Sequence, residues 1–207
     1  MPNIAPAPHA AGIVHPDLRM DLAWVQWFDD IRTRTSDGHK DLLSGSFSDS
    51  SALDVVSDIT ADYEHYRLVL QNVRCSQAGA NLQLRVSNNL GTSYESGAAD
   101  YTWIIEENNG TVSTTTDAED TEIHLMSPSS GTGTSNIING SIELFSLAST
   151  DVVKFIRWDI SYKNSSNELV LVKGTGIYNT AEAIDALRVS FSSGDITSGQ
   201  YKLYGIR

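Results

Sequence analysis

Acidic side chains come closest, in type and spacing, to a chemical site in this 207-residue chain. Asp117, Glu119 and Asp120 lie close together and could supply the oxygen ligands that Ca²⁺ prefers. Because the segment lacks the glycine and the distal glutamate of an EF-hand loop, a solvated acidic loop is the favoured interpretation. Glu106 and Glu107 could serve a glycosidase as its two acids, but neighbouring strand residues point to opposite faces, so they do not form such a pair.

Histidines and nucleophiles give no clearer signal. The histidines are scattered along the chain, and three of the five lie in its first 40 residues, so they predict no metal site. They are His9, His15, His39, His65 and His124. The sequence has no Gly-x-Ser-x-Gly turn, no phosphate-binding loop and no pairing of its one cysteine with a histidine. We therefore expect no catalytic residue, no cofactor and no metal.

Charge and composition exclude further classes of function. The formal net charge of −12 opposes the electrostatic attraction on which most nucleic-acid binding depends. No apolar stretch approaches the roughly 18 residues of a membrane span. Charged residues make up 19% of the chain, and Ser, Thr, Gly and Asn replace them, which is typical of strands and loops. We expect neither nucleic-acid binding nor membrane insertion.

The N-terminal part is predicted to hold an extended arm and a helix. Prolines crowd the first 16 residues, a composition that cannot bury enough apolar surface to fold alone, so 1–15 is interpreted as an extended arm. A helix is expected from Pro16, which suits a first helical position, to about residue 33, and a polar linker then runs to residue 40. The apolar residues of this helix, expected to anchor it, are Leu18, Leu22, Trp24, Val25, Trp27, Phe28 and Ile31.

These apolar side chains form two stripes that together exceed a single amphipathic face. A helix of this kind needs partners on several sides. The sequence leaves three candidates open: copies of the same helix in a bundle, a groove on another protein, or the sheet of its own domain.

Alternation of apolar residues with period two begins after the linker and predicts eight or more half-buried strands within 41–207. Polar turn clusters separate the strands at intervals of roughly 10 to 15 residues, with no helices between them, which favours an antiparallel jelly-roll sandwich. The one helical interruption expected is a turn over Thr180 to Asp185. The fold class is therefore predicted to be all-β, with an N-terminal arm and one α-helix.

Aromatic residues of the predicted sandwich mostly alternate with polar neighbours, so core packing accounts for most of them. Sugar-binding modules stack pyranose rings on exposed aromatics. Tyr94 and Tyr101 lie near Ser/Gly-rich loops and are the candidates for such a ligand-binding platform.

The closing residues carry a recognisable pattern. An Arg-bearing strand around Arg188 is followed by the loop Ser193-Gly194-Asp195-Ile196-Thr197-Ser198-Gly199 and by a last strand that ends Leu203-Tyr204-Gly205. Together with the segments Ile59 to Tyr66 and Ala80 to Ser87, this pattern resembles the jelly-roll domains of bacteriophage tail-fibre and related virion fibre proteins. The resemblance covers about residues 55–207 in order, apart from roughly 108–135, which carries no pattern that matches it.

The resemblance implies a non-enzymatic structural protein of a phage virion, assembled in the cytoplasm of the host bacterium. It implies a tail fibre or fibre-like receptor-binding subunit, a homotrimer held to other virion proteins by the N-terminal arm and helix. Loops such as 88–98 and 126–137 would contact a glycan or a protein of the host surface. Two alternatives remain open: a capsid decoration or head-fibre (cement) protein, and a polysaccharide depolymerase.

Overall fold

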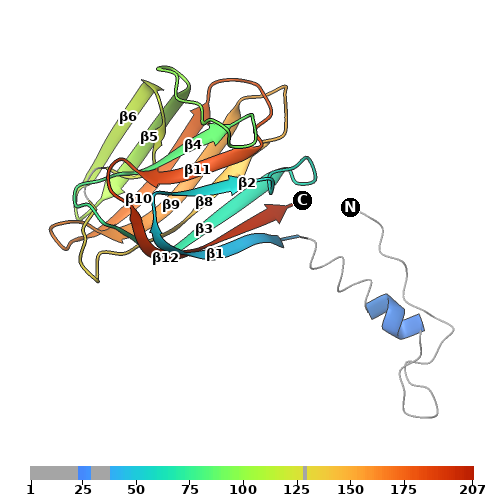
Figure 1. Ribbon diagram of the computed structural model, residues 1–207, viewed down its shortest axis with the longest axis horizontal. Helices are drawn as coiled ribbons and strands as arrows, with labels where there is room; N and C mark the ends of the chain where they lie inside the picture. The colour runs from blue at the N-terminus through green and yellow to red at the C-terminus, as the bar shows by residue number, and fades with distance from the viewer. Residues whose placement is uncertain (1–22, 29–37, 128–129) are drawn as a thin grey trace, which may run out of the picture.

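The computed structural model describes residues 23–28, 38–127 and 130–207. The strands from residue 40 onward form two antiparallel sheets packed face to face (Figure 1). The larger sheet orders β1 (Lys40–Ser50), β12 (Ile196–Ile206), β3 (His65–Cys75), β8 (Ile138–Phe145), β9 (Lys154–Lys163), β10 (Leu169–Tyr178), β5 (Tyr101–Asn108) and β6 (Val112–Asp120). The smaller sheet orders β2 (Ala52–Val56), β11 (Ala186–Phe191), β4 (Leu82–Ser87) and β7 (Ile123–His124).

This strand order is that of a jelly roll with two additions. The set β1-β12-β3-β8 faces the set β2-β11-β4-β7, and these eight strands make up the jelly roll. The hairpin of β9 and β10 and the hairpin of β5 and β6 then extend the larger sheet beyond β8. The predicted antiparallel sandwich is confirmed.

Alternation along the strands builds the core between the sheets. In β9, Ile156, Trp158 and Ile160 are buried while Phe155 and Arg157 are exposed. The same period of two governs β3, β4 and β11, so each contributes one apolar face. Residues with fully buried side chains come from both sheets and include Tyr66, Leu68, Leu84, Ile105, Ile123 and Leu125.

The loop between the last two strands has the conformation that its glycines suggest. Gly194 and Gly199 both have positive φ, 76° and 140°, which other residues rarely adopt. Between them the side chain of Ile196 is fully buried. The closing motif therefore shapes the chain reversal and fills the core.

Two local expectations were wrong. Asp117 and Glu119 are exposed as expected but lie in β6, so the predicted acidic loop is an edge strand. Thr180 to Asp185 connects β10 to β11 without a helical turn. β6 is a strand because it pairs along its length with β5, which outweighs its local composition. The end of the 180–185 segment instead bonds to other parts of the chain, since the Ile184 and Asp185 amides donate to the carbonyls of Leu147 and Ser87.

The N-terminal expectations can be followed only in part. Residues 23–28 are helical, with Trp24 and Trp27 half-buried and their ring centroids 5.4 Å apart. Val25 and Phe28 are exposed, at 37% and 46%. The predicted arm, 1–15, and the anchoring residues Leu18, Leu22 and Ile31 lie outside the described residues. In the described part of the chain, no helix combines the length and the hydropathy needed to cross a membrane.

Candidate functional site

Charged side chains form a continuous row across the outer face of the smaller sheet. Arg188 of β11 lies directly opposite Asp54 of β2 on one side and Arg85 of β4 on the other. Arg85 reaches Glu122, which precedes β7. We call this row the polar strip; its members are Asp54, Arg188, Arg85, Glu122, His124 and Asp120.

One end of the polar strip is a bidentate ion pair. The Nε and Nη2 atoms of Arg188 donate to the two carboxylate oxygens of Asp54 at 2.7 and 2.6 Å. The guanidinium also lies over the ring of Tyr94, 4.2 Å from its centroid. The hydrogen bonds to Asp54 raise the pKa of Arg188, and burial together with the Asp54 charge raises the pKa of Tyr94 to about 12.

In the middle of the strip, Arg85 holds one oxygen of Glu122. Its Nε atom donates to Glu122 Oε2 at 3.1 Å, and its Nη2 atom donates to the same oxygen. Burial acts to raise the pKa of Glu122, but the hydrogen bonds and charge of Arg85 outweigh it and hold that pKa below its ordinary value. Glu122 is therefore a stable carboxylate.

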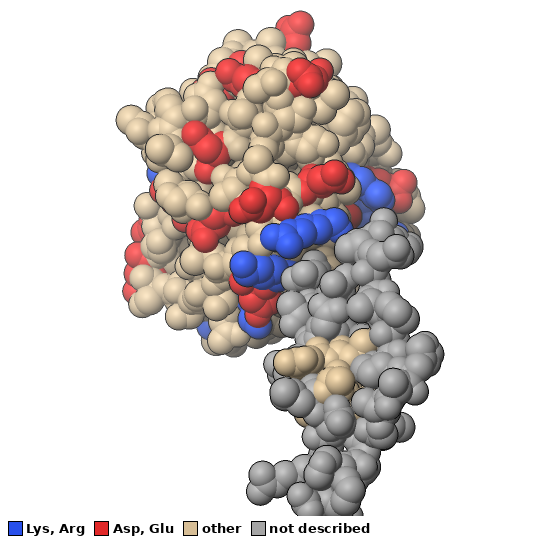
Figure 2. All heavy atoms as spheres, turned by 90° about the vertical axis from the view of Figure 1, so that its right-hand side faces the viewer, with Lys and Arg blue, Asp and Glu red and all other residues tan. Residues whose placement is uncertain are grey.

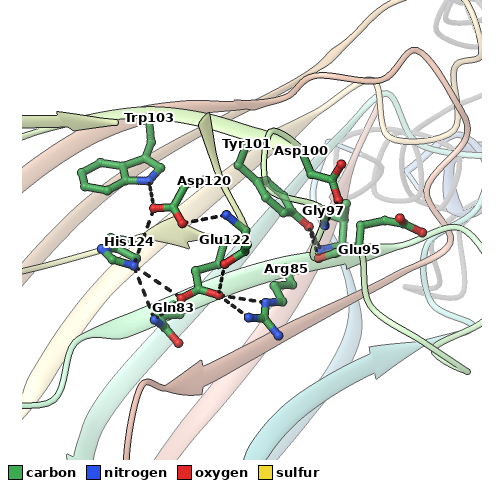
Figure 3. Close-up of polar contacts among 12 residues, drawn as sticks. Gln83, Arg85, Glu95, Gly97, Asp100, Tyr101, Trp103, Asp120, Glu122 and His124 are labelled. Atoms are coloured by element: carbon green, nitrogen blue, oxygen red, sulfur yellow. Dashed lines mark hydrogen bonds and ion pairs between the residues drawn. The ribbon is translucent and has the colours of Figure 1, made fainter. Parts of the chain in front are cut away.

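At the other end, three side chains converge in what we call the acid–histidine cluster: Asp120, Glu122 and His124 (Figure 3). Nε2 of His124 lies 3.8 Å from Asp120 Oδ2 and 3.5 Å from Glu122 Oε1. The imidazole stacks on the indole of Trp103, with 4.9 Å between centroids. Trp103 in turn donates its Nε1–H to Asp120 Oδ2 at 3.0 Å.

Local chain geometry brings this cluster together. Asp120 is the last residue of β6, and His124 belongs to β7, so the three residues alternate through the short turn between the two strands. An extended chain places every second side chain on the same face. The spacing Asp-x-Glu-x-His was therefore the signal available in the sequence, although Asp120 was expected to group with Asp117 and Glu119 instead.

Of the two predicted aromatic platforms, Tyr101 is a core residue. Its side chain is fully buried, and its hydroxyl accepts a hydrogen bond from the Val86 amide at 2.9 Å and donates to the Glu95 carbonyl at 3.1 Å. The expectation of a ring available for stacking is corrected here, because inward alternation in β5 places Tyr101 between the sheets.

Tyr94 lies half-buried beside the polar strip, where Arg188 covers its ring. The 88–98 loop therefore borders the strip. The adjacent acids of β5 lie on opposite faces as strand geometry requires: Glu106 is exposed, whereas Glu107 accepts a hydrogen bond from the Ser127 amide at 2.9 Å.

Comparison with known proteins adds little to this picture. No family model matches the chain, and no curated protein matches it. One solved structure, a structural genomics protein of unknown function from Bacteroides ovatus, shows 10% identity over 63% of this chain, with a TM-score of 0.19. The chain covers 45% of that protein's length. A TM-score this low supports no argument about fold or function.

Proposed function

We propose that this chain is a non-enzymatic structural protein of a phage virion, a tail fibre or fibre-like subunit that binds a receptor on the host. The observation that carries the proposal is the jelly-roll strand order, closed by the Gly194 and Gly199 reversal and the final strand β12. That closing segment is where the sequence most resembles virion fibre domains, and the resemblance implies this fold.

The chemistry of the polar strip supports a binding role over catalysis. A glycosidase needs one carboxyl with a raised pKa to act as general acid. Glu122 has a lowered pKa and is bound by Arg85, and Asp54 is bound on both oxygens by Arg188. These two carboxylates are committed to ion pairs, so neither Glu122 nor Asp54 suits the role of a general acid.

The strip offers a flat, polar surface of the kind that suits a glycan or a polar protein surface. Arg188 and Asp54 are each 39% exposed in their side chains, and Arg85 is 37% exposed. Their guanidinium and carboxylate groups are pre-oriented, so hydrogen bonds to sugar hydroxyls would cost little ordering of the side chains. Weak binding at one site becomes strong attachment when copies are repeated on a particle.

The N-terminal helix is proposed to anchor the chain to the virion. The described turn at 23–28 exposes Val25 and Phe28, so its apolar surface is available to other chains. We infer a homotrimer whose helices bundle together or dock on another virion protein, with the sandwich projecting outward.

The direct test measures whether purified protein competes with phage adsorption to host cells. We expect saturable binding to cells or extracted envelope glycans, weakened in an Arg188→Ala/Arg85→Ala variant that retains its far-UV circular dichroism. Lys202→Ala, on β12 of the other sheet, serves as the control.

Two other outcomes would replace the proposal. Absence of binding at high micromolar concentration, with labelled antibody locating the protein across the capsid, would establish the decoration protein instead. Release of new reducing ends from host polysaccharide would establish the depolymerase.

A further inference from the structure

We propose that the acid–histidine cluster binds a divalent transition-metal ion, Zn²⁺ being the best match, through Asp120 Oδ2, Glu122 Oε1 and His124 Nε2. The three ligand atoms lie within 4.8 Å of one another, and the two separations from the imidazole nitrogen are 3.8 and 3.5 Å. In a tetrahedral zinc site with bonds of 2.0–2.2 Å, ligand atoms lie roughly 3.3–3.6 Å apart. The two separations from the imidazole nitrogen need side-chain shifts of at most a few tenths of an ångström. The two carboxylate oxygens, which lie within 4.8 Å of each other, can require a shift of up to about 1.5 Å.

Gln83 borders two of the proposed ligand atoms. Glu122 Oε1 lies 2.6 Å from the Gln83 side chain, so the group that Gln83 presents there is its amide NH₂. The same nitrogen lies 3.5 Å from His124 Nε2. Gln83 therefore holds Glu122 Oε1 in the position from which it faces His124 Nε2.

Surrounding residues hold all three ligands in place, as outer-shell residues do in metal sites. Arg85 occupies the far oxygen of Glu122 and leaves Oε1 directed at the cluster. Trp103 orients Asp120 through its indole N–H and fixes the imidazole by stacking. The ligands come from one turn, but the residues that orient them come from β4 and β5.

Charge and donor type select the class of metal. Two carboxylates beside one arginine leave a net negative charge of one when the imidazole is neutral, which attracts a cation. Ca²⁺ takes six to eight oxygen ligands, and Mg²⁺ also prefers oxygen, whereas an imidazole with two carboxylates suits Zn²⁺ or Co²⁺. The side chains of Asp120, Glu122 and His124 are 17%, 13% and 28% exposed, so a fourth position would be open to water.

Such an ion would join the two sheets at this end of the sandwich. Asp120 ends β6, which belongs to the larger sheet, and His124 lies in β7 of the smaller one. The metal would therefore fix the inserted β5–β6 hairpin against the jelly roll. This inference does not depend on the proposed virion function.

The test is calorimetric titration of the full chain, first treated with EDTA, with ZnCl₂, CoCl₂ and MgCl₂. Other histidines can bind zinc adventitiously, so His124→Gln is compared with His65→Gln, a control on β3 of the larger sheet. We expect a saturable site of one Zn²⁺ per chain, weakened at least tenfold by His124→Gln, unchanged in His65→Gln, and not filled by Mg²⁺ at the same concentration.

A second readout guards against a variant that does not fold. Bound Co²⁺ should give visible d–d absorption in the wild-type protein, and Glu122→Gln should remove this absorption while retaining the far-UV spectrum. Absence of saturable Zn²⁺ binding at 100-fold excess would overturn the proposal. Binding that survives His124→Gln undiminished, or a site filled by Mg²⁺ but not by Zn²⁺, would overturn it equally.

Discussion

At the scale of single residues, buried hydroxyls connect loops to strands. The Tyr101 hydroxyl joins the Val86 amide of β4 to the Glu95 carbonyl of the 88–98 loop. Tyr66 does the same for the segment before β3, since its hydroxyl exchanges hydrogen bonds with the Thr60 amide and carbonyl at 2.7 and 2.6 Å. These loops are therefore fixed from within the core.

Removing one such hydroxyl should measurably lower the free energy of unfolding. Tyr101→Phe keeps the ring but leaves the Val86 amide and the Glu95 carbonyl without this partner, which should lower the free energy of unfolding by about 1–3 kcal/mol. Urea denaturation followed by tryptophan fluorescence measures the change. Tyr204→Phe, half-buried on the outer face of β12, should change stability by less than about 0.5 kcal/mol. Equal effects of the two substitutions would contradict this account.

Buried tyrosines also predict sensitivity to alkali. Burial raises the pKa of Tyr94 to about 12 and raises the pKa values of Tyr101 and Tyr178 further. Unfolded tyrosines lose their protons near pH 10, so above that pH the folded state binds more protons than the unfolded state. Stability should therefore fall as pH rises from 10 toward 12.

Lys154 has the opposite effect on folding stability, and it does so at lower pH. Its ammonium is buried and donates to the carbonyls of Ser149 and Val152 at 2.6 and 2.5 Å, and burial lowers its pKa. This group makes stability rise with pH only up to about 10.5, where the unfolded lysine also loses its proton. Urea unfolding at pH 8, 9.5 and 11 should show the decline at pH 11 alone, and a smaller decline in Tyr101→Phe.

At the scale of elements, the sequence predicted strands that are buried on one face. Leu82 to Val86 and Lys154 to Tyr162 alternate because one face of β4 and one of β9 pack in the core. β6, where a loop was expected, shows why an edge strand lacks this signal. It is an edge strand whose residues are almost all exposed, so it has no apolar face, and only its pairing with β5 makes it a strand.

The candidate site escaped prediction for a related reason. Alternation alone brings Asp120, Glu122 and His124 to one side, but the residues that orient them lie far away in sequence. Arg85 and Trp103 contact Glu122 and Asp120 only because β4 and β5 pack against the turn. The spacing of the three residues in the sequence therefore shows neither the charges around them nor the distances between them, and a metal site cannot be argued without both.

Close packing between neighbouring strands provides a test at this scale. Gly174 of β10 lies opposite Trp158 of β9, and a Cβ at Gly174 would lie 2.1 Å from two carbons of the indole. Gly174→Ala should therefore cost about 1–3 kcal/mol of unfolding free energy by overpacking.

Two further variants test whether contact with the Trp158 indole causes the loss of stability in Gly174→Ala. Gly38→Ala should be nearly neutral, because among the described residues no atom beyond its chain neighbours lies within 4 Å of the added methyl. Adding Trp158→Phe to Gly174→Ala should cost less than the sum of the two single changes, because the smaller ring makes room for the methyl. Strict additivity in urea denaturation would show that the indole is not the obstacle.

At the scale of the whole molecule, the chain is strongly acidic. Acidic side chains are spread over the face shown in Figure 2, and no broad basic patch is visible there. With a net charge of −12, attraction to phosphate backbones is opposed at long range.

Truncation before β1 separates the sandwich from the N-terminal helix. The register of β1 begins with Lys40 opposite Gly205, so a truncated protein starting at Gly38 keeps every strand pair of both sheets. We expect it to retain a strand-rich far-UV spectrum and the urea midpoint of the full chain. If the helix holds the trimer, sedimentation should find the truncated protein monomeric, and the full chain with Leu22, Trp24 and Phe28 replaced by serine should behave likewise. A trimer that persists in both proteins would place the subunit contacts on the sandwich, and a helix-dominated spectrum of the truncated protein would contradict the fold itself.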